Sequence, residues 1–232
     1  MLNKDKHKLI MTQILKDIYS DISISSLLGF KGGTAAHLFY KLPRFSVDLD
    51  FDLLENTEKN RDLVFQRIHD ILSKHGEIKD EQKKFFTVFF SVSYEPGEHQ
   101  IKVEINTRKT GARYEMKSYL GIPMLVAGKE SMLAGKLVAM TRRKEFVSRD
   151  LYDTHFFLTQ RWDIDMNVLT SYQVKSLKEY LEACVTLIEN IPDNVLLEGL
   201  GELIDEKEKV FVKNKLKNDT IFLLKVRADI IK

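Results

Sequence analysis

The sequence predicts an α+β fold, with strands and helices mixed up to about residue 122 and helices alone after it. Val47–Leu53 alternates apolar and polar residues, which is the two-residue period of a half-buried strand. Residues 85–94 and 99–106 are rich in aromatic and β-branched side chains and flank a turn, as in an antiparallel hairpin. After Pro123, apolar residues recur at three- and four-residue spacing, which predicts helices.

The other elements of the first half follow from the same spacing, with Gly and Pro as breaks. Leu9, Ile14 and Ile18 recur with a helical period, and Gly32-Gly33 separates a short apolar strand from a helix. In chain order we expect a helix, a strand, a helix, a strand, a helix and the two strands of the hairpin: Lys8–Tyr19, Ser26–Lys31, Thr34–Tyr40, Val47–Leu53, 59–74, 85–94 and 99–106.

The second half is expected to hold only helices, because its apolar residues keep a helical period between a few Gly and Pro breaks. Pro192, Gly199 and Gly201 mark the expected interruptions. The predicted helices are Lys129–Arg143, Arg149–Gln160, 166–190, 194–217 and 219–231.

The composition is that of an ordinary globular protein. Of 232 residues, 44% are hydrophobic and 30% are charged, which excludes a disordered or fibrous chain. The net charge of +2 gives no strong field for nucleic acid or membrane, so anion binding would need local clusters. The single cysteine, Cys184, suits a reducing compartment. Because a signal-peptide core and long apolar runs are both missing, we expect a soluble cytoplasmic protein without a membrane partner.

Three aspartates lie on the polar face of the strand Val47–Leu53: Asp48, Asp50 and Asp52. Same-face neighbours on a strand are two rises of ~3.3 Å apart. Their carboxylates therefore repel each other, unless one takes a proton or a cation lies between them. Mg²⁺ and Mn²⁺ prefer such oxygen ligands. The alternative is the solvated outer face of an edge strand, where acidic residues deter aggregation.

Glu104 lies on the polar face of the strand 99–106. If that strand is the neighbour of Val47–Leu53, Glu104 joins Asp48 and Asp50 as a third oxygen ligand. Otherwise it is an ordinary surface glutamate.

The segment Phe30–Ala35 combines the end of a strand, two glycines, a hydroxyl residue and the start of a helix. Gly32 and Gly33 would let the backbone approach a ligand, and a helix N-terminus offers free N–H groups to phosphate oxygens. Thr34 is expected to be the helix N-cap, a phosphate ligand, or both. A simple turn is the alternative.

Two cations are unusually placed on the predicted helix Lys129–Arg143. On a helical wheel, Lys136 and Arg143 fall within the apolar arc, about two turns apart. A buried unpaired charge is costly. Either these side chains extend to solvent, or they bind an anion such as a triphosphate or an RNA backbone.

Two acids one turn apart, Asp150 and Asp153, follow Ser148, which is the expected N-cap of the next helix. Acids in a first turn complement the helix dipole. The functional interpretation is that Asp150 orients Lys136 or Arg143 through a salt bridge, while Asp153 supports the structure.

Four segments resemble a known family in both content and order. Phe30–Ala35 and Arg44–Phe51 resemble the nucleotidyltransferase superfamily of DNA polymerase β type, and more closely the AbiEii-type toxins of type IV toxin–antitoxin and abortive-infection systems. Leu133–Ala139 and Arg149–Asp153 resemble the third and fourth motifs of that family. The resemblance covers about residues 28–158, more than half of the chain.

The resemblance implies a small mixed sheet flanked by helices in residues 1–122, and a helical domain, 123–232, that completes the active-site cleft. It implies an NTP as substrate and Mg²⁺ or Mn²⁺ as cofactor. The metal ligands would be Asp48, Asp50 and Glu104, which act in catalysis together with Lys136 and Asp150. The nucleotide-binding residues would be Gly32, Gly33, Thr34, Arg44, Ser46, Lys136 and Arg143.

The expected activity is transfer of NMP from the NTP to an acceptor hydroxyl. The resemblance favours RNA, in particular the 3′ end of tRNA, as acceptor, with growth arrest as the result and a cognate antitoxin as partner. Two alternatives stay open: a module that binds a nucleotide or RNA without catalysis, and an enzyme whose acceptor is a small molecule or a protein.

Overall fold

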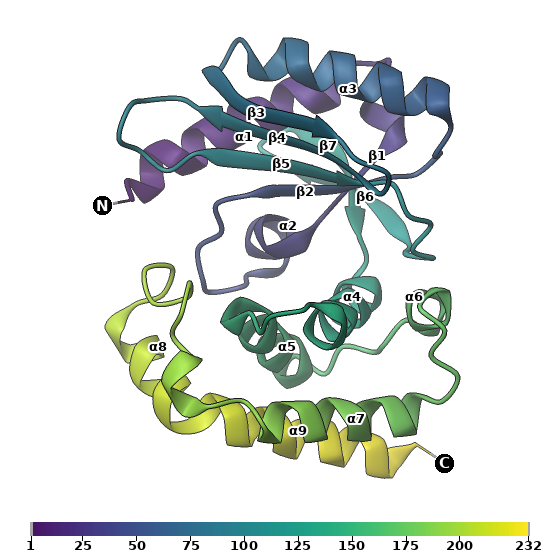
Figure 1. Cartoon of the computed structure of the whole chain (residues 1–232), viewed down its shortest axis with the longest axis vertical. Helices are drawn as coiled ribbons and strands as arrows, with labels where there is room; N and C mark the ends of the chain where they lie inside the picture. Colours follow the sequence, from purple (N-terminus) through teal and green to yellow (C-terminus); the bar gives the residue numbers. More distant parts are fainter. Residues whose placement is uncertain (1, 232) are drawn as a thin grey trace. The chain divides into compact units, whose positions relative to one another are not determined.

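The computed structural model describes residues 2–231, which form two compact units (Figure 1). Within the described residues, the first comprises 2–109 and Tyr114–Ala127, and the second comprises Thr110–Arg113 and 128–231. The first unit therefore extends past residue 122, where the sequence suggested a boundary, because 122–127 form a strand of its sheet.

The described part of the first unit is a seven-stranded mixed sheet with the strand order β3-β4-β5-β2-β1-β7-β6. The neighbours β1 and β7, and likewise β2 and β5, are parallel, and the other neighbours are antiparallel. The strands are β1 Leu28–Lys31, β2 Leu49–Leu53, β3 Glu77–Lys83, β4 Thr87–Ser93, β5 Ile101–Asn106, β6 Tyr114–Tyr119 and β7 Ile122–Ala127. The helices are α1 Lys4–Ser20, α2 Gly32–Tyr40 and α3 Glu58–Leu72, with a 3₁₀ turn at Ser25–Leu27. The expected mixed sheet flanked by helices is confirmed.

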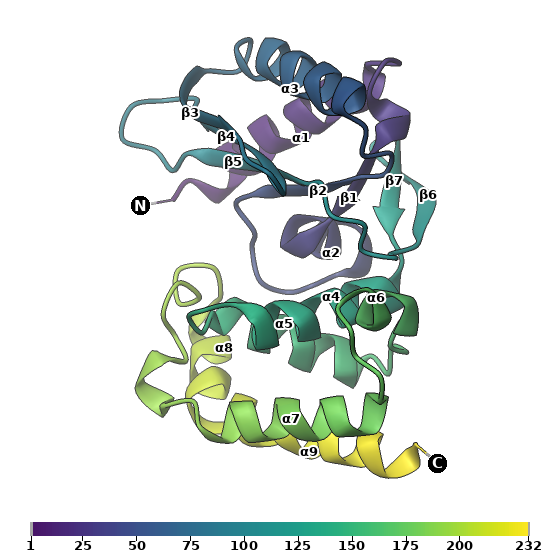
Figure 2. The ribbon, with the colours of Figure 1, turned by 45° about the vertical axis from the view of Figure 1, so that its right-hand side comes forward.

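Helices cover both faces of this sheet. Figure 2 shows α1 and α3 on one side of the sheet and α2 on the other. Leu49, Phe51 and Val103 are fully buried in the core. The residues that alternate with them, Asp50 and Glu104, must point to the other face, because successive side chains of a strand alternate. That is the face on which α2 packs against β2.

The second unit is helical. Its helices are α4 Lys129–Arg142, α5 Ser148–Thr159, α6 Met166–Ser171, α7 Leu177–Glu189, α8 Glu206–Phe211 and α9 Lys217–Ile230, with a 3₁₀ turn at Asp193–Val195 and a π-helical turn at Val212–Leu216. A small apolar core joins α4 to α6 through Ala134, Val138, Val168 and Leu169. None of the helices within residues 2–231 combines the length and hydropathy needed to span a membrane.

Most predicted elements are confirmed, but the sheet is larger than expected. The hairpin of β4 and β5 is antiparallel as predicted. The strands β3, β6 and β7 were not predicted. Glu77–Lys83 consists mainly of charged residues and is largely exposed, so it forms a strand only because β4 supplies a pairing edge. The pair β6–β7 turns at Leu120-Gly121, where both residues have positive φ.

Two predicted long helices are interrupted. Gln173, with φ of 66°, lies between α6 and α7, so residues 166–190 are not one helix. Likewise 194–217 is not continuous, since turns around Gly199 (φ of 63°) precede α8 and a π-helical turn follows it. Apolar spacing cannot detect such breaks, because the residues on both sides of each break face the same core.

Candidate functional site

Two carboxylates from distant parts of the chain are neighbours on the sheet. β2 and β5 pair in parallel, and the register sets Asp50 opposite Glu104. Neighbouring strands lie about 4.8 Å apart. Asp50 is half-buried, and Glu104 is exposed. Two like charges this close favour a cation between them, so the condition that the sequence left open for Glu104, namely that its strand lies beside β2, is met.

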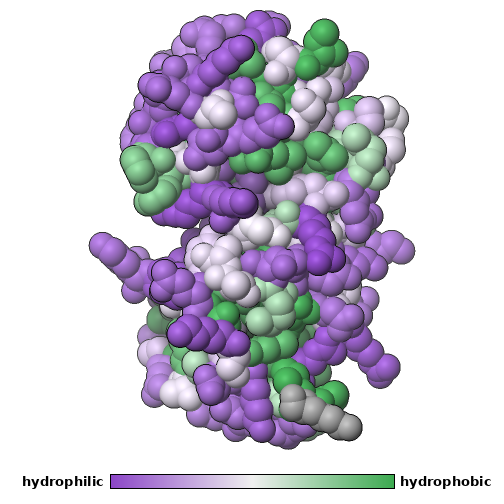
Figure 3. Space-filling view, turned by 90° about the vertical axis from the view of Figure 1, so that its right-hand side faces the viewer, coloured by the Kyte–Doolittle hydropathy of each residue, from purple (hydrophilic) through white to green (hydrophobic). Residues whose placement is uncertain are grey.

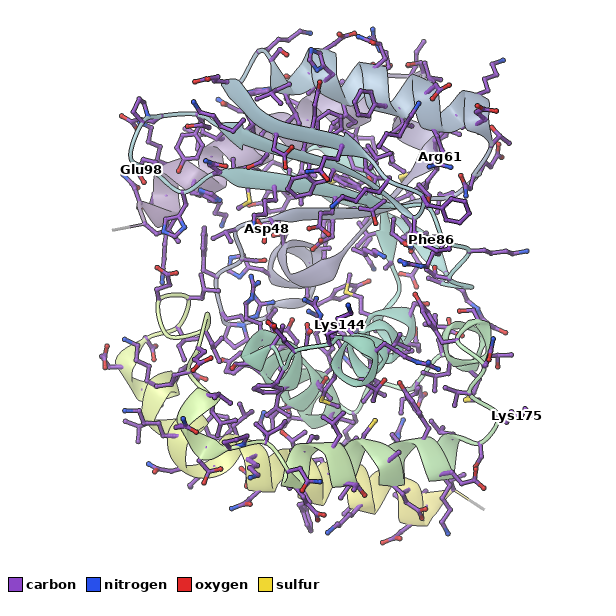
Figure 4. All side chains as sticks on the ribbon, in the orientation of Figure 1. Asp48, Arg61, Phe86, Glu98, Lys144 and Lys175 are labelled. Atoms are coloured by element: carbon purple, nitrogen blue, oxygen red, sulfur yellow. The ribbon has the colours of Figure 1, made fainter. Side chains whose placement is uncertain are left out.

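The chain around Asp48, just before β2, is held by two buried side chains. The Thr34 hydroxyl donates a hydrogen bond to the backbone oxygen of Asp48. Nε2 of His7 lies 2.9 Å from the backbone oxygen of Val47, and Nδ1 lies 3.0 Å from the hydroxyl of Tyr94. The backbone of Asp48 is therefore fixed from α2 and from α1, while its side chain remains half-buried (Figure 4).

The two glycines are required by close approach of other groups. Gly32 has φ of +79°, and a Cβ atom there would lie 2.1 Å from Oδ2 of Asp50. A Cβ atom on Gly33 would lie 2.4 Å from Nη2 of Arg44 and 2.8 Å from Oγ of Ser46. The structure thus brings together the expected carboxylate and the expected nucleotide-binding residues at the start of α2.

The role expected of Thr34 needs one correction. The N-cap of α2 is Lys31, and no side chain caps this helix end. Thr34 lies inside the first turn, is 1% exposed, and directs its hydroxyl to Asp48. The glycine pair allows the helix to begin two residues earlier than predicted.

Asp52 shares a strand face with Asp50 but has a different environment. Its side chain pairs with Lys31, accepts a hydrogen bond from Asn106 at 2.7 Å, and accepts another from the Tyr114 hydroxyl at 2.5 Å. Asp52 is only 3% exposed. This carboxylate ties the ends of β1, β5 and β6 together. Sequence reasoning missed Lys31 and Tyr114 as its partners, because neither is close to it along the chain.

The carboxylates fit a divalent ion that arrives with a nucleotide. Within residues 2–231, no group of three His, Cys, Asp or Glu side chains is arranged to hold a metal ion by itself. Mg²⁺, however, is commonly held by one or two carboxylates together with waters and substrate phosphates. Asp50 and Glu104 supply two such oxygen ligands side by side. The three-carboxylate set with Asp48 stays a prediction.

The second unit holds its own cluster of charges. Nζ of Lys136 lies 2.9 Å from Oδ1 of Asp150 and 2.8 Å from Oδ2 of Asp153. Arg143 forms an ion pair with Asp150 (Nε–Oδ2 2.9 Å). The side chains of Asp150 and Asp153 are 3% and 0% exposed, and that of Lys136 is 16% exposed. The predicted salt bridges of Asp150 are therefore present, and Asp153 shares Lys136.

This cluster bears on two expectations. The charges of the cations within the apolar arc are balanced by the carboxylates of α5, and their binding of an external anion stays a prediction. The N-cap of α5 is Val147, not Ser148. Ser148 instead donates its hydroxyl hydrogen bond to the backbone oxygen of Val195 at 2.8 Å.

Comparison with solved structures identifies the class of fold. A Helicobacter pylori protein classed as a nucleotidyltransferase matches with a TM-score of 0.59 and 22% identity, over 97% of this chain and 93% of that one. The H. pylori protein JHP933 matches with a TM-score of 0.54 and 21% identity, over 99% and 97% of the two chains. The fold is that of a nucleotidyltransferase. No curated protein sequence matches.

The family follows from the sequence match. The family model for the nucleotidyl transferase AbiEii toxin of type IV toxin–antitoxin systems matches residues 13–217. The chain belongs to the AbiEii family, as its motifs predicted, and is a nucleotidyltransferase.

Replacement of Gly32 by alanine should damage the site and the stability of the first unit. A positive φ costs an L-residue about 1–2 kcal/mol, and the added methyl group must also displace Asp50. We expect Gly32→Ala to lower the free energy of unfolding by at least twice the cost of placing an L-residue at a positive φ. Urea unfolding followed by circular dichroism measures this loss.

Gly97→Ala is the matched control for Gly32→Ala. Gly97 has φ of +83° with open space where a Cβ atom would lie. Gly97→Ala therefore measures the loss in unfolding free energy caused by the positive φ, without a steric clash. Equal losses in the two variants would contradict the close approach of Asp50.

Replacement of Lys136 by methionine should destabilise the second unit. Removing one partner of a buried ion pair leaves uncompensated charge, at a cost of about 3–5 kcal/mol. Urea unfolding followed by the fluorescence of Trp162, the single tryptophan, reports on this unit. The exposed partner gives the control: Arg143→Gln should cost less than about 1 kcal/mol. Adding Asp150→Asn and Asp153→Asn to Lys136→Met should restore most of the loss, and no recovery would refute the ion-pair explanation.

The stability of the first unit should fall in mild acid because of His7. Burial lowers the pKa of His7 below its usual 6.5, outweighing the hydrogen bond to Val47, which raises it. The unfolded chain therefore binds a proton more readily below about pH 6.5, and folding loses up to about 1.4 kcal/mol per pH unit until the folded pKa is reached. In urea unfolding by circular dichroism at pH 7.5 and 5.5, His7→Gln should lose less stability than the wild type. An identical loss would contradict this.

Proposed function

We propose that this nucleotidyltransferase is a toxin that transfers NMP from an NTP to a hydroxyl of RNA, with a divalent cation, and that a cognate antitoxin counteracts it. The family supports the toxin role. The observation that carries the catalytic proposal is the parallel register that sets Asp50 beside Glu104, with Gly32 against Asp50.

The carboxylates have two roles in the proposed reaction. Asp48, Asp50 and Glu104 would hold the cation that accompanies the triphosphate, and Glu104 would also accept the proton of the acceptor hydroxyl. A divalent ion, when bound by these carboxylates, would lower the pKa of the hydroxyl and stabilise charge on the leaving group. The acceptor oxygen bonds to the α-phosphorus as the bond from that phosphorus to pyrophosphate breaks.

The start of α2 would bind the phosphates. The first N–H groups of a helix have no intrahelical acceptor, and the helix dipole favours an anion there. Gly32 and Gly33 carry no side chain that could separate the backbone from a phosphate. Arg44, 2% exposed beside Gly33, adds a fixed positive charge. A nucleotide-binding role for Lys136 and Arg143 stays a prediction from the family motif.

Replacement of Asp50 by asparagine tests this function. The change keeps the size of the side chain and removes the charge that binds the cation, so we expect transfer to fall at least 100-fold, about the loss of one transition-state electrostatic contact. The purified chain is incubated with Mg²⁺, each labelled NTP in turn and total RNA, and labelled RNA is quantified. Asp48→Asn should behave alike.

Asp80→Asn is the control for a lost surface carboxylate, since Asp80 is exposed on the edge strand β3. It should retain full transfer. Undiminished transfer by Asp50→Asn would refute the catalytic assignment. Labelled protein or a labelled small molecule in place of labelled RNA would identify a different acceptor, and nucleotide binding by calorimetry without any labelled product would indicate a binding module.

A further inference from the structure

Two phenylalanines are exposed at the tip of the β3–β4 hairpin. Phe85 is 77% exposed and Phe86 is 44% exposed. Their rings meet edge to face with centroids 4.5 Å apart. Small or polar residues normally occupy such turns, and an exposed Phe forgoes the stabilisation that burial would give. Because both rings are exposed, packing of the hydrophobic core does not explain why this turn contains two phenylalanines.

The tip is held firmly against the end of β5. The backbone N–H of Thr107 donates to the oxygen of Phe86 at 3.0 Å, and the Thr107 hydroxyl donates to the oxygen of Phe85 at 3.2 Å. The N–H of Lys84 closes the turn on the oxygen of Thr87 at 2.8 Å. A rigid aromatic surface binds a flat ligand at lower entropic cost than a mobile one.

A cation lies over one of the two rings, and further basic residues are close in the sequence. The Arg108 guanidinium lies 4.1 Å from the centroid of the Phe86 ring, in a cation–π contact. Lys84, which precedes Phe85, and Lys109, which follows Arg108, are both exposed. Figure 3 presents the side of the molecule on which Figure 4 labels Phe86, and hydrophobic atoms there form small groups within a mainly hydrophilic surface.

A cavity of about 510 Å³ adjoins the tip. It is lined by Asn56, Glu58, Arg61, Asp62, Lys83, Lys84 and Phe85. Arg61 donates from Nη2 to the backbone oxygen of Lys84 at 2.9 Å, while its Nε is buried and makes no hydrogen bond in the described structure. The cavity therefore joins an aromatic ring to a wall of mixed charge, in which Lys83 pairs with Asp62 and Glu58 lies with Arg61 and Lys84.

The position of the tip relates it to the carboxylates. Thr107 follows Glu104 by three residues along β5, which is about 10 Å at ~3.3 Å per residue. Figure 4 shows Phe86 and Arg61 toward the same end of the sheet. The cavity is bordered by Arg61 of α3, on the face of the sheet opposite to Glu104. A polymer whose terminal hydroxyl lies at Glu104 would therefore pass around the end of β5 to reach the tip with the residues next to its end.

We propose that the Phe85–Phe86 tip binds unpaired bases of the acceptor RNA strand. The inference rests on the proposed function, which makes RNA the acceptor. Exposed rings flanked by Arg and Lys match the chemistry of single strands, since every base has a π-face for stacking and every nucleotide has a phosphate for a cation. Such binding tolerates many sequences.

The size of the apolar surface favours a nucleic acid over a protein. A standard protein interface buries about 800 Å² on each partner, whereas a fully buried aromatic side chain contributes only about 150–250 Å². Two rings bordered by charged residues fall short of that area, yet they suffice for one or two bases.

Replacement of the aromatic rings tests the site. A fluorescently labelled, unstructured 12-nucleotide RNA is titrated with the full chain, and anisotropy gives Kd. Phe85→Ser and Phe86→Ser should each weaken binding about tenfold, the equivalent of about 1.4 kcal/mol of stacking per base. NTP affinity by calorimetry should not change. Thermal unfolding confirms that the variants fold.

A second variant tests the phosphate contacts without touching the rings. Lys109→Gln should reduce the slope of log K against log salt by about 0.7, the value for one neutralised phosphate of a single strand. Leu120→Ser is the matched control, because Leu120 is 76% exposed at the tip of another hairpin of the same unit. It should bind the RNA like the wild type.

The outcomes separate this site from the proposed function. If the wild type does not bind the RNA, or if the Phe variants bind as tightly as Leu120→Ser, the tip proposal is overturned. If the Phe variants change the sedimentation coefficient of the protein but not its affinity for RNA, the tip is a contact between copies of the chain, and the tip proposal is overturned. If the Phe variants lose affinity but no labelled NTP is transferred to RNA by the wild type, the tip proposal is supported and the proposed function fails.

Discussion

The parallel pairing of β2 with β5 is the constraint on which the candidate site depends. It brings Asp50 beside Glu104, more than fifty residues further along the chain. The apolar residues on the opposite face of both strands are fully buried. A slip of one residue would expose them and turn the carboxylates into the core, so the register is strongly specified. The hydrophobic core thus sets the spacing of two charges that it does not touch.

The neighbouring residues give Asp50 and Asp52, two acids of β2, different environments. Gly32 permits the backbone of α2 to begin against Asp50, where any side chain would clash. Asp52, on the same face of the same strand, is instead enclosed by Lys31, Asn106 and Tyr114. Asp50 is therefore half-buried beside Gly32, while Asp52 stabilises the junction of three strands. The same residue type serves two purposes because the adjacent strands present different groups.

The two units use charge in different ways. In the second unit, Lys136 and Arg143 are matched by Asp150 and Asp153, so the cluster is internally neutral and largely buried. Such a network specifies how α4 and α5 pack, because a misplaced helix would bury an unpaired charge. The first unit has Asp50 and Glu104 side by side on a sheet face, and Arg108 lies over the ring of Phe86 at an exposed hairpin tip.

The sequence by itself determined the alternation of β2, the glycine pair before α2, the β4–β5 hairpin and the family motifs, because each is a local pattern with its own period or spacing. It predicted that Glu104 would join the aspartates only if two strands were neighbours, and tertiary pairing decided that they are. The edge strand β3, the cap of α2 and the partners of Lys136 depended on groups remote in the chain. No local period records such contacts, since the free energy that favours them comes from burial and pairing in the folded state.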